Sequence, residues 1–259
     1  MKKTVSILGT GWLGHPLALS LKENYKVKVS IRTKQKEETF EKEGLLPFVL
    51  NETSLEGLDE LLDTNYLFIN FPPSKFKDFK AFLEKIYSHK NIKNIKKIIF
   101  ISSTSIYPDE EKTFNEDEKF TNPKSQKIYD IEKLIKEKTD LIFRCAGLMG
   151  ASRISGRYFA GKELDSEDVK INYVHLDDVI GATIFALEND LKGIYNLCSS
   201  EHPTRKEIYF KNASKFGFDK PIFKNKKEYK ERLIDGSKIE REGFKYKYPN
   251  PLEYEYSNN

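Results

Sequence analysis

The chain has 259 residues, of which 38% are hydrophobic and 32% charged, and its 44 basic and 40 acidic residues give a formal net charge of +4. A chain of this length can bury a core larger than one minimal domain needs. The lysines are spread along the whole chain, which argues against a basic stripe for nucleic acid. No apolar segment is long enough to span a membrane, and Gly9, Gly11 and Pro16 break the run that could act as a signal peptide.

The two cysteines and four histidines point to neither a disulfide nor a metal site. Cys145 and Cys198 lie far apart, each inside a predicted strand, so we expect buried free thiols in a reducing compartment, the cytoplasm. The histidines are scattered and no C-x-x-C pattern occurs, so the sequence predicts no metal ligands.

Residues 4–33 predict a strand, a glycine turn, a helix and a second strand. Residues 5–8 form a short apolar run, and residues 27–31 alternate apolar with polar. Between them, leucines recur at the spacing of one helix face: Leu13, Leu17 and Leu21. The turn fits G-x-G-x-x-G in the context that makes this pattern specific for a dinucleotide, and reads Gly9-Thr10-Gly11-Trp12-Leu13-Gly14.

Each glycine of this turn has an expected role. Gly9 permits the tight turn, Gly11 lets the backbone approach a pyrophosphate, and Gly14 lets the helix pack on the strand. The start of the helix adds free N–H groups and partial positive charge for the phosphates. The alternative is a plain strand–helix turn that binds no ligand.

The end of the second strand indicates which dinucleotide binds. An acid there would bond the ribose 2′-hydroxyl of NAD, whereas an arginine accommodates the 2′-phosphate of NADP. The chain has Arg32 and Thr33 here and no acid until Glu37. We therefore expect NADP(H), with NAD(H) as the second choice.

Strands and helices are predicted to alternate along the rest of the chain. The strands are expected at residues 46–50, 66–70, 97–101, 141–145 and 194–198, and the helices at 34–43, 55–62, 75–88, 124–138, 176–189, 205–216 and 237–242. Such alternation predicts an α/β doubly wound parallel sheet. Residues 109–122 are expected to be a loop, residues 151–175 to be irregular, and the tail with Pro249 and Pro251 to be weakly ordered.

Two strand ends carry candidate ligand contacts, because ligands of an open parallel sheet bind at the carboxyl ends of its strands. Phe71 and Pro72 follow the fourth strand and are expected beside the adenosine or pyrophosphate, although a plain strand stop explains them equally well. Four hydroxyl side chains, unusual for a mere turn, follow the fifth strand: Ser102, Ser103, Thr104 and Ser105.

Together with the glycine turn, four later segments resemble the extended short-chain dehydrogenase/reductase superfamily, in particular its atypical, YxxxK-poor branch. FISSTSIYP is similar to the segment after the fifth strand of that superfamily, and FRCAGLMGASR to a later strand and turn. INYVHLDDVIGATIFALEN resembles its V-H-V-D-D-V-A helix, and GIYNLCSSEHPTRKEI its closing strand and helix. The segments occur in the family's order over residues 3–215. The resemblance implies a Rossmann sheet with a small appended C-terminal substrate lobe.

What the resemblance implies about catalysis concerns three residues. The family uses a tyrosine phenol as acid and base, a lysine four residues later, and a Ser or Thr that Ser103 matches. Tyr129 and Lys133 satisfy the Y-x-x-x-K spacing. A phenol is a poor base at neutral pH, but a nearby ammonium and the oxidised nicotinamide favour its phenolate. The resemblance thus implies Ser103, Tyr129 and Lys133 as catalytic residues, with Ser102 and Ser103 also near the cofactor.

A second alignment of the same helix with the family pattern stays open. It equates Glu132 with the family glutamate and leaves the normal distance to Arg144. The tyrosine and lysine places would then fall on Lys124 and Ile128, which cannot do this chemistry.

Further candidates follow from the same resemblance. Arg153 and Arg157 come after a glycine turn where the family binds substrate, and a bidentate arginine suits a carboxylate or phosphate; two solvated arginines are the alternative. His202 and Arg205 belong to the appended lobe, although a helix capped by Thr204 explains them as well.

Three polar residues near the start of the helix at 176–189 have structural expectations. Asp177 and Asp178 are expected to be helix caps, and His175 to be a structural residue rather than a base.

The sequence therefore predicts a dinucleotide-binding domain at residues 1–147 and 176–200 and a small substrate lobe at 148–175 and 201–259. The expected function is NADP(H)-linked oxidoreduction, epimerisation or dehydration of a small polar, sugar-like substrate by a cytoplasmic monomer or homodimer. Neither nucleic acid nor membrane is expected as a partner. The alternative is a regulatory module that senses NADP(H) without turnover.

Overall fold

The chain divides into two compact units, and a computed structural model describes residues 2–224 and 229–257 of it. The first unit comprises Met1–Ser102, Asp130–Phe143 and Ala186–Gly193. The second comprises Ser103–Tyr129, Arg144–Phe185 and Ile194–Asn259. The expected substrate lobe, residues 148–175 and 201–259, falls entirely within the second unit.

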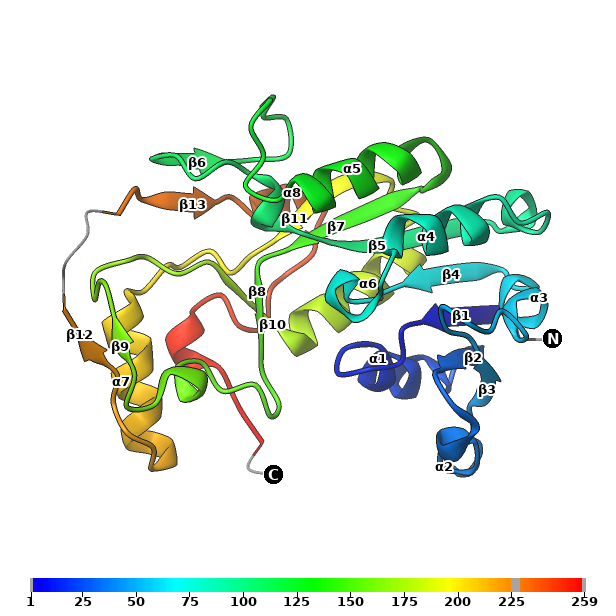
Figure 1. Cartoon of the computed structure of the whole chain (residues 1–259), viewed down its shortest axis with the longest axis horizontal. Coiled ribbons are helices and arrows are strands. Elements are labelled where there is room, and N and C mark those ends of the chain that lie inside the picture. The colour runs from blue at the N-terminus through cyan, green and yellow to red at the C-terminus, as the bar shows by residue number, and fades with distance from the viewer. Residues whose placement is uncertain (1, 225–228, 258–259) are drawn as a thin grey trace. The chain divides into compact units, whose positions relative to one another are not determined.

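A seven-stranded sheet has the strand order β11-β7-β5-β4-β1-β2-β3 (Figure 1). Its strands are β1 Thr4–Leu8, β2 Lys26–Ile31, β3 Leu46–Val49, β4 Tyr66–Ile69, β5 Lys97–Ser103, β7 Leu141–Cys145 and β11 Gly193–Leu197. The order reverses at β1, which pairs in parallel with β2 on one side and β4 on the other. The predicted α/β doubly wound parallel sheet is therefore confirmed, and the ligand edge is expected where the order reverses.

Helices connect most of these strands. They are α1 Gly14–Leu21, α2 Glu37–Lys42, α3 Leu58–Leu62, α4 Phe79–Tyr87, α5 Gln126–Ile135, α6 Leu176–Glu188, α7 Arg205–Phe216 and α8 Ser237–Arg241. The predicted apolar face of α1 is buried, as Leu13, Leu17 and Leu21 are each at most 3% exposed. Thr204 caps α7 in a reciprocal capping box with Glu207, as its sequence predicts.

The fourth helix begins later than its apolar pattern suggests. Pro73 opens a short 3₁₀ turn (Pro73–Lys75), and Phe76 after it is extended. Asp78 then caps α4 by accepting a hydrogen bond from the N–H of Ala81 at 3.0 Å. The segment after β4 is thus a loop of its own, and it carries the predicted cofactor contacts Phe71 and Pro72.

Three pairs of very short parallel strands organise the second unit. β6 (Lys112–Phe114) pairs with β13 (Arg232–Ile234), β8 (Gly147–Met149) with β10 (Tyr173–His175), and β9 (Glu163–Leu164) with β12 (Ile222–Phe223). The expectation that residues 109–122 form only a loop is therefore wrong at β6. Three residues are too few to show the alternation of a strand, and their partner lies far away in the chain.

The expectation of a weakly ordered tail is also wrong. Tyr248 and Tyr254 are 6% and 3% exposed, and the Ser199 hydroxyl bonds to the Tyr248 carbonyl and the Tyr254 hydroxyl. His175 has the structural role expected of it: its Nε2 lies 2.9 Å from the Glu255 carbonyl oxygen. Asp178 binds the tail rather than capping its own helix, because its carboxylate accepts the N–H groups of Lys247 and Tyr248.

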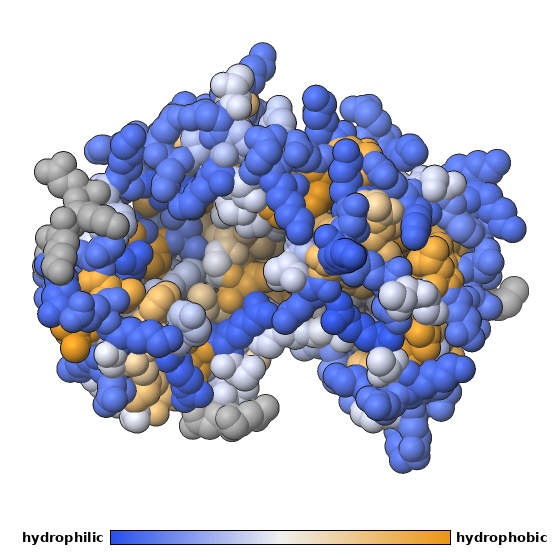
Figure 2. Space-filling model, viewed as in Figure 1, coloured by the Kyte–Doolittle hydropathy of each residue, from blue (hydrophilic) through white to orange (hydrophobic). Residues whose placement is uncertain are grey.

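The surface visible in Figure 2 is largely hydrophilic, as the charged composition suggests, and both cysteines are buried. Figure 2 shows hydrophilic side chains over most of the visible face. Cys145 and Cys198 are buried free thiols, as expected, and burial raises the pKa of Cys145 to about 12. None of the helices formed by residues 2–224 and 229–257 is long and apolar enough to cross a membrane.

Candidate functional site

The glycine turn after β1 has the close packing that its three glycines predict. Gly9 adopts φ +97°, a left-handed conformation that favours glycine, and a Cβ there would collide with the backbone of Asn70. A Cβ on Gly14 would collide with the Gly9 carbonyl. The Gly9 N–H donates to the Ser30 hydroxyl at 2.8 Å, which ties the turn to β2.

Gly11 differs from its two neighbours because nothing lies within 4 Å of the place its Cβ would take. It is exposed, at the turn that leads into α1. The turn is therefore closed at Gly9 and Gly14 and open at Gly11, which is the cradle that a pyrophosphate needs at the start of a helix. Thr10, Trp12 and Leu13 complete it, with Leu13 buried at 3% exposure.

Arg32 lies exposed at the end of β2 and is held by the loop after β4. Its Nη2 donates to the Lys75 carbonyl at 2.8 Å, and its guanidinium carbon lies 5.7 Å from the centre of the Phe76 ring. One neutral acceptor leaves donors of the guanidinium for a ligand, since arginine carries five N–H groups. Thr33 beside it is extended and exposed.

The loop after β4 brings aromatic side chains together in the first unit. The Phe71 ring lies 5.3 Å from each of the rings of Phe76 and Phe82. Pro72 is exposed beside it. The two predicted contacts thus belong to the same loop that holds Arg32.

The serine-rich end of β5 has two different environments. Ser102 is buried and its hydroxyl donates to the Glu132 carboxylate of α5 at 2.5 Å. Ser103 accepts the N–H of Ser105 and opens a 3₁₀ turn over Thr104–Ile106. Glu132 thus bonds α5 to the end of β5, which favours the alignment that equates it with the family glutamate.

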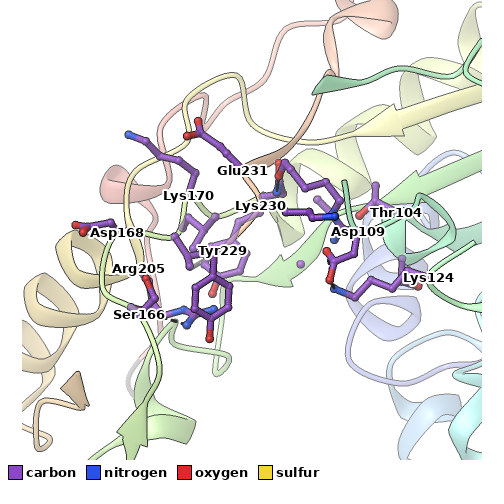
Figure 3. Close-up of a pocket in the computed structure, with 18 of the residues that line it drawn as sticks. Thr104, Asp109, Lys124, Ser166, Asp168, Lys170, Arg205, Tyr229, Lys230 and Glu231 are labelled. Carbon is purple, nitrogen blue, oxygen red and sulfur yellow. Dashed lines mark hydrogen bonds and ion pairs between the residues drawn. The ribbon is translucent and has the colours of Figure 1, made fainter. Parts of the chain in front are cut away.

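The second unit holds a pocket of about 720 Å³, and Ser103, Thr104 and Ser105 after β5 are among the residues that line it. Lys124 and Asp109 line it and point toward one another (Figure 3), with the ammonium 3.2 Å from each carboxylate oxygen. Further lining comes from two neighbouring segments and from α7: Ser166, Asp168 to Tyr173, Arg205, Tyr209 and Tyr229 to Arg232.

Of the residues predicted for catalysis, the structure places only Ser103 in this pocket. Tyr129 and Lys133 are not among its lining residues. The Tyr129 ring instead lies 6.0 Å from the Phe120 ring, and Lys133 is exposed on α5. Their catalytic role stays a prediction, and Lys124 is the residue of this helix region that reaches the pocket.

The arginines predicted for substrate also differ in placement. Arg205 lines the pocket, whereas Arg153 and Arg157 do not. Arg153 closes a backbone bridge with Gly150, and the Arg157 guanidinium lies 5.7 Å from the Phe218 ring. His202 has its Nδ1 3.0 Å from the Ile171 carbonyl, and burial lowers its pKa.

A buried polar network beside the pocket has no predicted counterpart. The Tyr107 hydroxyl donates to Asn196 at 2.8 Å and accepts from Arg144 at 3.0 Å. Burial raises the pKa of Tyr107. Arg232, which lines the pocket, donates to the Tyr107 carbonyl at 3.1 Å. The signal that could have found it is the pair of Tyr107, shortly after β5, and Arg144, a charged residue inside β7.

No group of His, Cys, Asp and Glu side chains suited to a metal ion occurs in the described part of the chain. The groups that the fold does present are the open glycine cradle with Arg32 in the first unit and the charged pocket in the second. The glycine cradle has the form that a dinucleotide needs, and the pocket has the form that a small polar ligand needs.

The fold is similar to that of solved nucleotide-sugar epimerases. UDP-N-acetylglucosamine 4-epimerase from Methanobrevibacter ruminantium M1 is 18% identical, with a TM-score of 0.78 over 97% of this chain and 96% of that one. UDP-glucuronic acid 4-epimerase from Bacillus cereus, solved in complex with NAD, is 17% identical, with a TM-score of 0.77 over 97% of each chain. At such low identity the likeness concerns the fold.

A closer relative gives the family. Protein YeeZ of Escherichia coli K12 is 36% identical over 96% of this chain and 98% of its own length. The chain therefore belongs to the YeeZ family. No family model matches the chain.

Proposed function

We propose that this protein binds NADP(H) and is an oxidoreductase or epimerase of the short-chain dehydrogenase/reductase type that acts on a small polar, sugar-like substrate. The observation that carries the proposal is the glycine turn, closed by packing at Gly9 and Gly14 and open at Gly11. A turn with no ligand has no need of that combination, because Gly11 meets no steric limit from the protein itself.

The residues of the first unit would hold the dinucleotide. The backbone at Gly11 and the start of α1 would bind the pyrophosphate, and Arg32 the ribose 2′-phosphate. The loop carrying Phe71 and Pro72 would cover the adenosine side. When bound, the nicotinamide supplies hydride transfer, which protein side chains do not provide.

Residues of the second unit would receive the substrate. Ser103 carries the hydroxyl that the family uses to orient a substrate oxygen, and it opens the pocket of about 720 Å³. Similar solved structures act on UDP-sugars by name, which supports a sugar-like substrate. Tyr129 and Lys133 would be the proton-transfer pair in the first alignment of α5 only, and the hydrogen bond between Ser102 and Glu132 favours the second alignment.

A non-catalytic sensor of NADP(H) is the second candidate. It is favoured by one observation, namely that the pocket contains Lys124 but neither Tyr129 nor Lys133. Both candidates share the cofactor site and differ only in turnover. Incubating the protein and NADP(H) with a panel of nucleotide sugars and sugar phosphates, followed by chromatography, separates them: product formation supports the enzyme, and its absence across the panel supports the sensor.

Calorimetric titration with NADP⁺ and NAD⁺ tests the cofactor assignment. We expect NADP⁺ to bind more tightly, and Arg32→Ala to remove most of the preference, because a hydrogen bond to a charged group contributes about 1.5–3 kcal/mol. Lys26→Ala, at the opposite end of β2, is the matched control and should leave both affinities unchanged. Equal or reversed affinities in the unaltered protein would overturn the NADP assignment.

A further inference from the structure

The loop between β4 and α4 is held at two points by residues that follow the neighbouring strands. Arg32, at the end of β2, donates from its Nη2 to the Lys75 carbonyl at 2.8 Å. Glu52, shortly after β3, accepts the N–H groups of Lys77 and Asp78 at 3.0 and 2.7 Å, one at each carboxylate oxygen. The loop is therefore bonded both to the end of β2 and to the segment after β3.

A carboxylate is well suited to hold this loop. A hydrogen bond from a backbone N–H to an ionised acceptor is shorter and stronger than one to a neutral acceptor. The N–H groups of Asp78 and Lys77 lower the pKa of the Glu52 carboxyl, so the group is ionised at neutral pH. Its two bonds fix two successive peptide groups, and they thereby fix the direction of the chain where the loop enters α4.

Arg32 is confined by the same arrangement. Its backbone carbonyl accepts the side-chain amide of Asn51 at 2.8 Å. Its guanidinium carbon lies 5.7 Å from the centre of the Phe76 ring, and the centres of the Phe76 and Phe82 rings are 4.8 Å apart. A side chain that is already confined loses less freedom when it binds a ligand. The position of the loop therefore determines how well Arg32 is prepared for a phosphate.

The charge of Glu52 has the opposite effect on a bound phosphate. Besides the two N–H groups, Arg32 also lowers the pKa of this carboxyl, so the two charges interact. A carboxylate beside Arg32 would repel a 2′-phosphate. The side chain is partly exposed, so solvent and salt screen this repulsion, whereas they do not replace the two bonds that fix the loop. We therefore expect the positioning of Arg32 to outweigh the repulsion.

We propose that Glu52 is a positioning residue for cofactor selectivity. Through its two bonds to the loop it keeps Lys75 and Phe76 in place, and these two residues hold the Arg32 guanidinium where it can receive the ribose 2′-phosphate. The inference rests on the proposed function in one respect, namely that NADP(H) binds with its 2′-phosphate at Arg32. It adds a residue that acts through the loop rather than on the cofactor itself.

Amide hydrogen exchange of the cofactor-free protein tests whether Glu52 holds the loop. Glu52→Ala should raise the exchange of the peptide that covers residues 71–78, because the N–H groups of Lys77 and Asp78 lose their acceptor. The matched control, Glu56→Ala, removes the same charge from the same segment and should leave that exchange unchanged. Equal exchange in the two variants would overturn the inference, whatever the cofactor result.

Calorimetric titration with NADP⁺ and NAD⁺ tests the consequence for selectivity. We expect Glu52→Ala to weaken NADP⁺ binding about tenfold, as when a hydrogen bond to a charged group is lost, and NAD⁺ binding by much less. Adding Glu52→Ala to Arg32→Ala should change the ratio of the two affinities no further, since Glu52 acts through Arg32. A general loss of structure would instead lower both affinities, and it would persist in the Arg32→Ala background.

Two results would overturn the inference and leave the NADP assignment in place. Tighter NADP⁺ binding by Glu52→Ala would show that the carboxylate acts only as a repelling charge. An unchanged ratio of the two affinities would show that it has no part in selectivity. Failure of the unaltered protein to bind either dinucleotide would overturn the proposed function, and the exchange measurement would still decide whether Glu52 holds the loop.

Discussion

Gly11 is the residue at which the absence of a side chain matters most for the proposed cofactor site. Gly9 and Gly14 are required by the packing of the protein, since a Cβ at either would collide with backbone. Gly11 has open space around it, so the protein alone would tolerate a side chain there. A requirement for glycine at this position therefore reports on a ligand and not on the fold.

Gly11→Val should consequently remain folded and lose NADP⁺ binding, because a branched side chain would occupy the space of the pyrophosphate. Circular dichroism and thermal melting check the fold, and calorimetry the binding. A folded variant with unchanged affinity would place the phosphate site elsewhere.

Tyr129 is the residue on which the two alignments of α5 disagree. The first makes it the acid–base group, but it contacts Phe120 and does not line the pocket. We expect Tyr129→Phe to change the turnover of a substrate found by screening less than twofold, with cofactor affinity intact. Proton transfer by a positioned side chain typically contributes about 10²- to 10⁴-fold. A loss of that size would instead make Tyr129 the catalytic phenol.

At the scale of elements, α5 explains why sequence alone could not choose between these alignments. The motif Y-x-x-x-K is satisfied by spacing, and its lysine is exposed on the helix. The structure shows instead that Glu132 of this helix is buried and bonded to Ser102 of β5. A glutamate facing a strand cannot be recognised from periodicity, because a charged residue normally indicates the solvent side of a helix.

The contact between the C-terminal tail and α6 has a testable pH dependence. Asp178 is 1% exposed and accepts two tail N–H groups, and burial raises the pKa of its carboxyl to about 6. Between its unfolded value near 3.8 and about 6 the folded protein holds a proton that the unfolded chain has lost. The protonated Asp178 carboxyl therefore contributes to the stability of the folded protein fully below pH 3.8, and this contribution is lost as the pH rises through about 6.

Asp178→Asn removes that titration while keeping the size of the side chain. As the pH rises from 4 to 7, the free energy of unfolding of the unaltered protein should therefore fall relative to that of the variant. Urea unfolding at several pH values measures it. A difference that is constant over this range would contradict the assignment.

At the scale of the whole molecule, the parts that could be predicted are those carried by local patterns. The strands of the sheet, the buried face of α1 and the cap at Thr204 all follow from periodicity, turn residues and capping chemistry within a few positions. The close packing at Gly9 and Gly14 and the open space at Gly11 likewise agree with the roles expected from the glycine pattern. These features depend on neighbours in the sequence.

The parts that could not be predicted depend on pairings across long stretches of chain. β6 pairs with β13 although Lys112 and its partner Arg232 are far apart in sequence, and neither strand exceeds three residues. The ordered tail depends on Ser199 and Asp178 meeting tyrosines near the end of the chain. The pocket of the second unit is also lined by segments that lie far apart in the sequence and share no motif.

A crystal structure of the protein with NADP⁺ tests the central claim most directly. We expect the pyrophosphate against the backbone at Gly11 and the start of α1, and the 2′-phosphate in contact with Arg32. Dinucleotide bound away from the glycine turn, or no bound dinucleotide at saturating concentration, would contradict the account.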